Sequence, residues 1–135
     1  MRSVLFFLLV FFQYPATAQE TAILDGKSFI VQVVEKNSSG SEDEMPDERI
    51  TFLKGKIHSS FGKNNDFPDA EFTVNIQEKD SMAVVYFRSG MVANPQKHTL
   101  YWTGEFRNGK IKGSAYRDRN GESSCVYEFE GVLDN

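Results

Sequence analysis

The sequence predicts an all-β fold, a single antiparallel up-and-down barrel of about eight strands. Apolar and polar residues alternate with a period of two in many short runs, as Phe72, Val74 and Ile76 do with the residues between them. No stretch beyond residue 18 keeps apolar residues at helical spacing for three turns. Segments rich in Gly, Asn, Asp, Ser and Pro, the residues that form turns, separate the runs.

Residues 1–18 have the pattern of a cleaved export signal, which is not part of the predicted domain. Arg2 supplies a positive charge, Val4 to Phe12 is an apolar run, and Ala16-Thr17-Ala18 places small residues where a signal peptidase cleaves. The apolar run is too short for a membrane span, which needs about 20 residues. We therefore expect residues 19–135 to be one secreted or periplasmic domain.

Charge and cysteine content exclude several classes of protein. Beyond Arg2 the chain carries 14 basic and 19 acidic side chains, so we expect no nucleic-acid partner. No run after residue 18 is long and apolar enough to span a bilayer as a helix. Cys125 is the single cysteine, so no internal disulfide can form, and it lies too far along the chain for a lipid anchor. We expect a small buried side chain there rather than a reactive thiol.

The predicted strands follow one another along the whole domain. Each is a run of alternating apolar and polar residues that is bounded by turn-forming residues. In chain order they cover residues 28–35, 48–53, 56–61, 71–77, 82–88, 100–106, 110–116 and 124–132.

Asn108-Gly109 lies between two of these runs and predicts a two-residue hairpin, because a type I′ turn needs positive φ at both central residues. This turn pairs Arg107 with Lys110, and the pairing continues along both strands. We expect further pairs of Phe106 with Ile111, Glu105 with Lys112, Gly104 with Gly113, Trp102 with Ala115 and Tyr101 with Tyr116. The two facing glycines indicate tight packing or room for a ligand.

The next turn, at 119–121, predicts a three-residue loop with a bulge. A two-residue loop would turn Tyr127 and Phe129 toward water, and a one-residue change of register reverses every side chain. The expected pairs are Asp118 with Glu122, Cys125 with Ala115, Tyr127 with Gly113 and Phe129 with Ile111, and Lys112 is expected between Glu105 and Glu128.

No catalytic or metal-binding signature is present, and we predict no catalytic residue, no metal and no cofactor. His58 lies on a predicted strand and His98 in a loop, and neither has the spacing of a metal-ligand pair. GxSxG is absent, and Gly26-Lys27-Ser28 leads into a strand rather than into the helix of a phosphate-binding loop. An enzyme is a less favoured class, and it requires a histidine to meet a carboxylate inside a cavity. An outer-membrane barrel is disfavoured, because Glu105, Lys112 and Glu128 would then face lipid.

Aromatic residues at inward positions are the remaining enrichment. Such residues fill a barrel core or line an apolar ligand cavity, and a barrel of about eight strands has room for either arrangement. The expected interior, and the candidate ligand-binding set, is Phe29, Phe52, Phe72, Trp102, Phe106, Tyr127 and Phe129.

Two long connections have unusual compositions. Residues 36–48 are rich in acidic side chains and serines, and we expect a solvated flexible loop without the spacing of a calcium loop. Residues 91–98 form the other connection that we consider. Both loops are candidate contact sites for a protein partner.

Leu24-Asp25-Gly26-Lys27-Ser28-Phe29 opens the first strand, and Trp102-x-Gly104 with Asn108-Gly109-x-Ile111-x-Gly113 lies near the end of the chain. This pattern resembles small lipocalin-like barrels of the calycin type, although Gly26 and Phe29 depart from the Gly-x-Trp spacing of lipocalins. The resemblance implies a secreted protein that holds a small hydrophobic ligand inside the barrel. The alternative is a protein-interaction barrel, an inhibitor or surface-associated factor, with a filled interior and rim loops that contact the partner.

Overall fold

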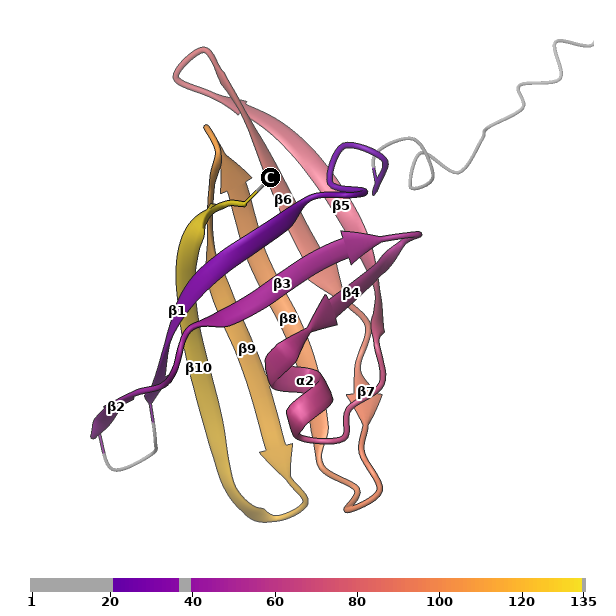
Figure 1. Ribbon diagram of the computed structural model, residues 1–135, viewed down its shortest axis with the longest axis vertical. Coiled ribbons are helices and arrows are strands. Elements are labelled where there is room, and N and C mark those ends of the chain that lie inside the picture. Colours follow the sequence, from indigo (N-terminus) through magenta and orange to yellow (C-terminus); the bar gives the residue numbers. More distant parts are fainter. Residues whose placement is uncertain (1–20, 37–39, 135) are drawn as a thin grey trace, which may run out of the picture.

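The structure is a computed structural model that describes residues 21–36 and 40–134. Its regular elements are antiparallel strands and short helical turns, so the all-β class is confirmed (Figure 1). The expected signal peptide and its cleavage site lie outside the described residues. No helix among the described residues is long and apolar enough to cross a membrane.

All eight predicted strands are present, two very short strands are added, and one strand ends earlier than expected. The elements are β1 (Ser28–Lys36), β2 (Glu42–Glu44), β3 (Glu48–Leu53), β4 (Lys56–Ser59), α2 (Ser60–Asn64), β5 (Ala70–Lys79), β6 (Met82–Ser89), β7 (Val92–Ala93), β8 (Thr99–Arg107), β9 (Lys110–Arg119) and β10 (Glu122–Leu133).

The strands form one antiparallel sheet that closes on itself in a ring. Its order is β10-β9-β8-β6-β5-β4-β3-β1, and β1 returns to pair with β10. That pairing joins β1 and β10 over eight residue pairs. The β4–β5 pairing has only two, Lys56 with Glu71 and Ile57 with Ala70, so it is the weak seam of the ring. In Figure 1, β1, β3 and β4 cross in front of the longer strands β8, β9 and β10.

The hairpin at Asn108-Gly109 is confirmed in full. Both turn residues have positive φ, at 52° and 73°. Arg107 lies opposite Lys110, and every pair predicted between these strands is present. Alternation and turn chemistry were therefore sufficient to set the register of β8 and β9.

The predicted three-residue loop before β10 was wrong. The turn has two residues, Asn120 and Gly121, and Arg119 pairs with Glu122. The extra residue that restores the inward phase lies inside β10, as an irregularity between Glu122 and Cys125.

Every later pair in β10 is consequently displaced by two residues from the prediction. Cys125 faces Arg117, Tyr127 faces Ala115, Phe129 faces Gly113, and Lys112 lies beside Glu130 rather than Glu128. A displacement of two keeps each side chain on its predicted face, so the predicted inward set is retained.

The predicted strand 56–61 was wrong over its last two residues, because β4 ends at Ser59 and α2 begins. The Ser59 hydroxyl accepts a hydrogen bond from the Gly62 N–H at 2.7 Å, the usual N-cap interaction of serine. The Asn65 N–H donates to the carbonyls of Phe61 and Gly62 at the other end. This single turn directs Phe61 into the interior.

The expectation of a flexible loop over residues 36–48 was wrong for part of this segment. Glu42–Glu44 forms β2 and pairs with the last three residues of β1. Lys36 explains why an exposed acidic run forms a strand here, since its ammonium group lies 3.5 Å from Glu42 and 3.0 Å from Glu128. The hydrogen bond with Glu128 raises the pKa of Lys36 above its ordinary value.

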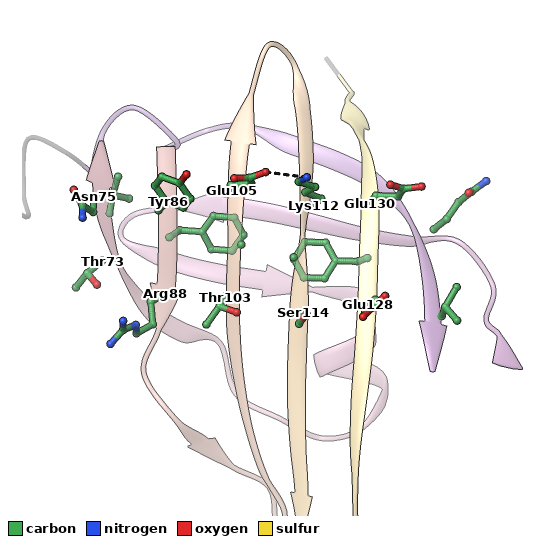
Figure 2. A pocket seen from close by; sticks show the side chains of 17 residues that line it. Thr73, Asn75, Tyr86, Arg88, Thr103, Glu105, Lys112, Ser114, Glu128 and Glu130 are labelled. Atoms are coloured by element: carbon green, nitrogen blue, oxygen red, sulfur yellow. Dashed lines mark ion pairs between the residues drawn. The ribbon is translucent and has the colours of Figure 1, made fainter. Parts of the chain in front are cut away.

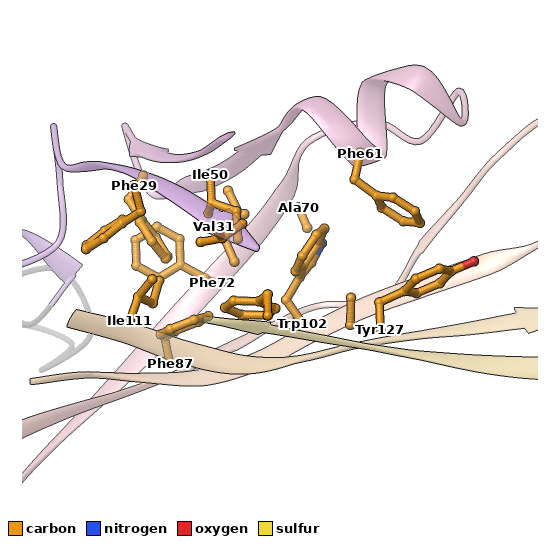
Figure 3. Close-up of a cluster of buried hydrophobic side chains, with 14 of the residues drawn as sticks. Phe29, Val31, Ile50, Phe61, Ala70, Phe72, Phe87, Trp102, Ile111 and Tyr127 are labelled. Carbon is orange, nitrogen blue, oxygen red and sulfur yellow. The ribbon is translucent and has the colours of Figure 1, made fainter. Parts of the chain in front are cut away.

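The core lies between the two layers of the ring and consists of side chains at alternating strand positions (Figure 3). Figure 3 shows Phe29, Val31 and Ile50 on one side, facing Phe87 and Ile111 on the other, with Phe61 reaching in from α2. Aromatic rings dominate this packing and meet mostly edge to face, as in Phe52 against Phe87 at 5.0 Å between ring centroids.

Gly113 is a position where no side chain fits. A Cβ atom there would lie 2.1 Å from the carbonyl oxygen of Thr103 and 2.8 Å from Cζ of Phe129. Gly104, directly opposite, is similarly restricted by the Phe87 ring. The rings of Phe87 and Phe129 thus occupy the side-chain space of the two glycines, which favours the packing interpretation of this pair.

We expect Gly113→Ala to destabilise the protein by about 1–3 kcal/mol or more, because backbone or a packed ring must move to admit the methyl group. Gly90→Ala is the matched control, since its nearest neighbour would be Glu71 O at 3.9 Å, an ordinary contact. Urea unfolding of both variants measures the difference. Equal stability of the two variants would contradict the close packing described here.

Candidate binding site

The predicted ligand-binding residues point into the ring, where they pack against one another and do not surround an open cavity. Six of the seven are buried in the core and Phe106 is half-buried against it. The rings contact one another directly, with Phe52 and Phe72 at 5.0 Å, Phe29 and Phe106 at 5.5 Å, and Trp102 and Phe129 at 5.7 Å between centroids. Their role in holding a ligand stays a prediction.

An enclosed interior cavity lies where Phe61 covers Trp102 and Tyr127, and its volume is about 10 Å³. This is close to the smallest volume that holds one water molecule. A lipid or other small apolar molecule does not fit there unless the α2 segment moves.

The large concave surface lies on the outside of the ring instead. A groove of about 900 Å³ crosses the outer face of β5, β6, β8, β9, β10 and β1 (Figure 2). A second groove of about 630 Å³ shares Gln32, Glu105, Lys112 and Glu130 with it, so the two form one continuous surface. We call this surface the outer groove.

The strand register arranges the outer groove in two rows that run across the strands. One row is Asn75, Tyr86, Glu105, Lys112, Glu130 and Gln32, and the other is Thr73, Arg88, Thr103, Ser114, Glu128 and Val34. Figure 2 shows ten residues of the two rows, from Thr73 and Asn75 to Glu128 and Glu130. Phe87 and Phe129 also line the groove, between the two rows, and their rings close its floor at Gly104 and Gly113. Hydroxyl, amide and charged groups therefore cover a closed aromatic floor.

The charges of the outer groove are only partly matched. Lys112 forms an ion pair with Glu105 at 3.2 Å, and Glu128 is paired with Lys36. No described side chain forms an ion pair with Arg88 or Glu130. These two lie three strands apart and two residues apart along the strands, which is about 16 Å at the usual strand dimensions. Arg88 and Glu130 are thus an unpaired cation and an unpaired anion of the larger groove, and Asp47, Arg107 and Lys110 of the second groove also form no ion pair with a described residue.

The predicted contact loop at 91–98 is held by a buried polar cluster. Asn94 is buried, and its amide donates to the Asn65 carbonyl at 3.1 Å. The His98 N–H donates to the Asn94 side chain, and Arg117 contacts His98 Nδ1 at 2.9 Å and Asn65 Oδ1 at 3.1 Å. Because a guanidinium group has donors only, His98 accepts at Nδ1 in this arrangement. The cluster fastens the loop to β9.

The histidines do not form a nucleophile–base arrangement. His58 Nδ1 lies 2.8 Å from Asp69 Oδ2, with both side chains about half exposed on the surface. His98 meets Arg117 and lies beside no carboxylate partner in the described part of the chain. Among the described residues, no group of three His, Cys, Asp or Glu side chains is arranged to hold a metal ion.

Cys125 is buried, as the sequence predicted. Burial raises the pKa of its thiol, and a hydrogen bond with Glu35 raises it further, whereas the charges of Arg119 and Arg117 act in the opposite direction. A buried thiol with a raised pKa is a poor nucleophile.

The outer groove was not predicted as a site. The sequence predicts only that its residues point outward into solvent, because polar residues alternate in the same way on every exposed strand face. The signal available in the sequence was the facing glycines, which place the groove floor but do not identify a ligand.

Comparisons with protein-family models, with curated proteins and with solved structures found no match.

The Cys125 geometry leads to a prediction about thiol labelling. At pH 8 we expect a disulfide reagent to modify native Cys125 at least about 100-fold more slowly than the urea-unfolded chain, because the reaction requires local opening. The absorbance of the released thiolate measures both rates. Similar rates in the two states would show an accessible, activated thiol instead.

Proposed function

We propose that this protein is a secreted protein-interaction domain, a lipocalin-like barrel filled by its own side chains, that binds its partner in the outer groove. The observation that carries this proposal is the difference in volume between the outer groove and the interior cavity. The outer groove has about 900 Å³ over its main part, whereas the interior cavity beside Trp102 has about 10 Å³.

The chemistry of the outer groove fits a folded or extended polypeptide better than an apolar small molecule. Its two rows contain hydroxyl and amide groups at the spacing of neighbouring strands, together with one half-buried aromatic ring, Tyr86. Arg88 and Glu130 offer complementary charges to a partner that carries an acidic and a basic group about 16 Å apart. Exposed Ile30 and Val132 lie opposite each other in the second groove, near Glu130, and supply apolar contact area.

The rim loops of the original hypothesis play a smaller part in this proposal. The 91–98 loop is fastened through Asn94 and His98, and β2 is paired with β1. Fixed loops are compatible with binding, but neither of the two large grooves described above is lined by residues 91–98.

The test exchanges the two unmatched charges of the larger groove, Arg88 and Glu130, and keeps the net charge constant. Arg88→Glu combined with Glu130→Arg should weaken partner binding at least about tenfold, which corresponds to about 1.4 kcal/mol, because each charge then repels its counterpart. Cross-linking in secreted material followed by affinity capture identifies the partner, and titration calorimetry measures the affinity.

The control exchanges an ion pair that does not line the outer groove, although Arg49 is the strand neighbour of Ile30. Arg49 and Asp134 lie 2.8 Å apart and line neither part of the groove. Arg49→Asp with Asp134→Arg should retain the partner. Equal binding by both double variants would exclude the outer groove as the interface.

Binding of a small hydrophobic ligand in the interior is the second candidate, and one observation favours it. The α2 segment follows the weak β4–β5 seam and places Phe61 over the small cavity, so its displacement would open the aromatic interior. Under the main proposal, fatty acids and apolar dyes should leave the melting temperature unchanged. A saturable rise in the melting temperature, together with lipid recovered by solvent extraction, would favour the second candidate.

A further inference from the structure

The β5–β6 hairpin has a free strand edge. Figure 1 shows the hairpin extending beyond the ends of the neighbouring strands. On one side, β5 pairs with β6 from Phe72 to Lys79 without a register shift. On the other side, β4 reaches only Ala70 and Glu71, and no described residue pairs with β5 from Thr73 to Lys79. Side chains from Asn75 to Lys79 are all exposed.

The backbone groups that point to the free edge can be assigned. The Phe72 N–H donates to Gly55 O on the β4 side, whereas Glu71 O accepts from the Gly90 N–H on the β6 side. Successive residues of an antiparallel strand direct their backbone groups to opposite sides. Val74, Ile76 and Glu78 therefore present unpaired N–H and C=O groups at the free edge.

We infer that this edge pairs with the same edge of a second copy of the chain, antiparallel and centred on Ile76. In this register Ile76 faces Ile76 of the partner, and Val74 faces the partner's Glu78. Because all three residues point to the edge, the pairing forms six backbone hydrogen bonds between the copies. It also covers Ile76, which is 40% exposed in one copy.

Other registers of the same two edges are poorer. A pairing centred on Glu78 opposes two carboxylates, which is destabilising. One centred on Val74 runs into β4, where the Phe72 N–H is already bonded. A pairing centred on Asn75 or on Gln77 places fewer residues with edge-directed backbone groups opposite one another. The edge is thus self-complementary in one register, as a two-fold symmetric interface requires.

The pairing also extends the outer face of the molecule. Thr73 and Asn75 line the outer groove at its β5 end. In the dimer, Asn75 faces Gln77 of the second copy, so the two outer grooves meet across the new strand pair. The inferred pairing follows from the free backbone groups of β5 and does not depend on what the outer groove binds.

Sedimentation equilibrium of the purified protein tests the dimer. We expect a reversible monomer–dimer equilibrium that Ile76→Lys weakens at least about tenfold, because the two lysines then face each other. Met82→Lys is the matched control. Met82 lies on β6 of the same hairpin, is 39% exposed and is not on the β5 edge, so its substitution should leave the dimer intact.

Two variants of opposite charge at Ile76 distinguish a loss of pairing from a folding defect. Ile76→Lys and Ile76→Glu should each be monomeric, and an equimolar mixture should form a heterodimer. Hydrogen exchange of the unmodified protein gives a second readout. The amides of Val74, Ile76 and Glu78 should gain protection with concentration, whereas those of Thr73, Asn75 and Gln77, which point toward β6, should be protected throughout.

Three outcomes overturn the inference. The first is a protein that stays monomeric up to millimolar concentration. The second is a dimer that Met82→Lys disrupts and Ile76→Lys does not. The third is concentration-independent exchange at Val74, Ile76 and Glu78, which would leave the edge for an extended segment of another protein.

Discussion

The pairing of β1 with β10 is the constraint on which the rest of the structure depends. It joins strands about a hundred residues apart and runs over eight residue pairs, from Phe29 with Leu133 to Lys36 with Val126. Closing so long a loop has an entropic cost that the pairing must offset. Gly131 shows how closely the strands approach, since a Cβ there would lie 1.9 Å from the Ile30 carbonyl oxygen. Closure requires glycine at this position.

Closure also divides every strand residue between two environments. Residues of one parity meet the aromatic interior, and those of the other parity form the outer face. The core side chains leave an enclosed cavity of only about 10 Å³ beside Trp102, whereas the polar and charged groups of the strands lie on the outer face. The outer groove is therefore the counterpart of the filled core, with Phe87 and Phe129 contributing to both.

Local chemistry explains which parts of this arrangement were predictable. Asn108-Gly109 set the register of β8 and β9 because a two-residue turn admits few alternatives. The prediction of the β9–β10 register was wrong because the extra residue that keeps Tyr127 inward can lie either in the turn or in the strand. Both positions satisfy the alternation of apolar and polar residues. The sequence did not reveal α2 because its capping serine, Ser59, also fits the end of a strand.

The unpredicted features have a common origin in the short β3–β4 hairpin. Its turn at Lys54-Gly55 lies level with Phe72, so β5 continues past the hairpin without a neighbour. At its other end, the Ser59 cap stops β4 beside Ala70, and α2 takes over the space that more strand would have covered. One short hairpin thus produces both the weak seam under Phe61 and the free edge centred on Ile76. A ring that is closed by the long β1–β10 pairing tolerates this opening, because the β1–β10 pairing and the weak β4–β5 seam are separated by β1, β3 and β4 on one side and by the other five strands of the ring on the other.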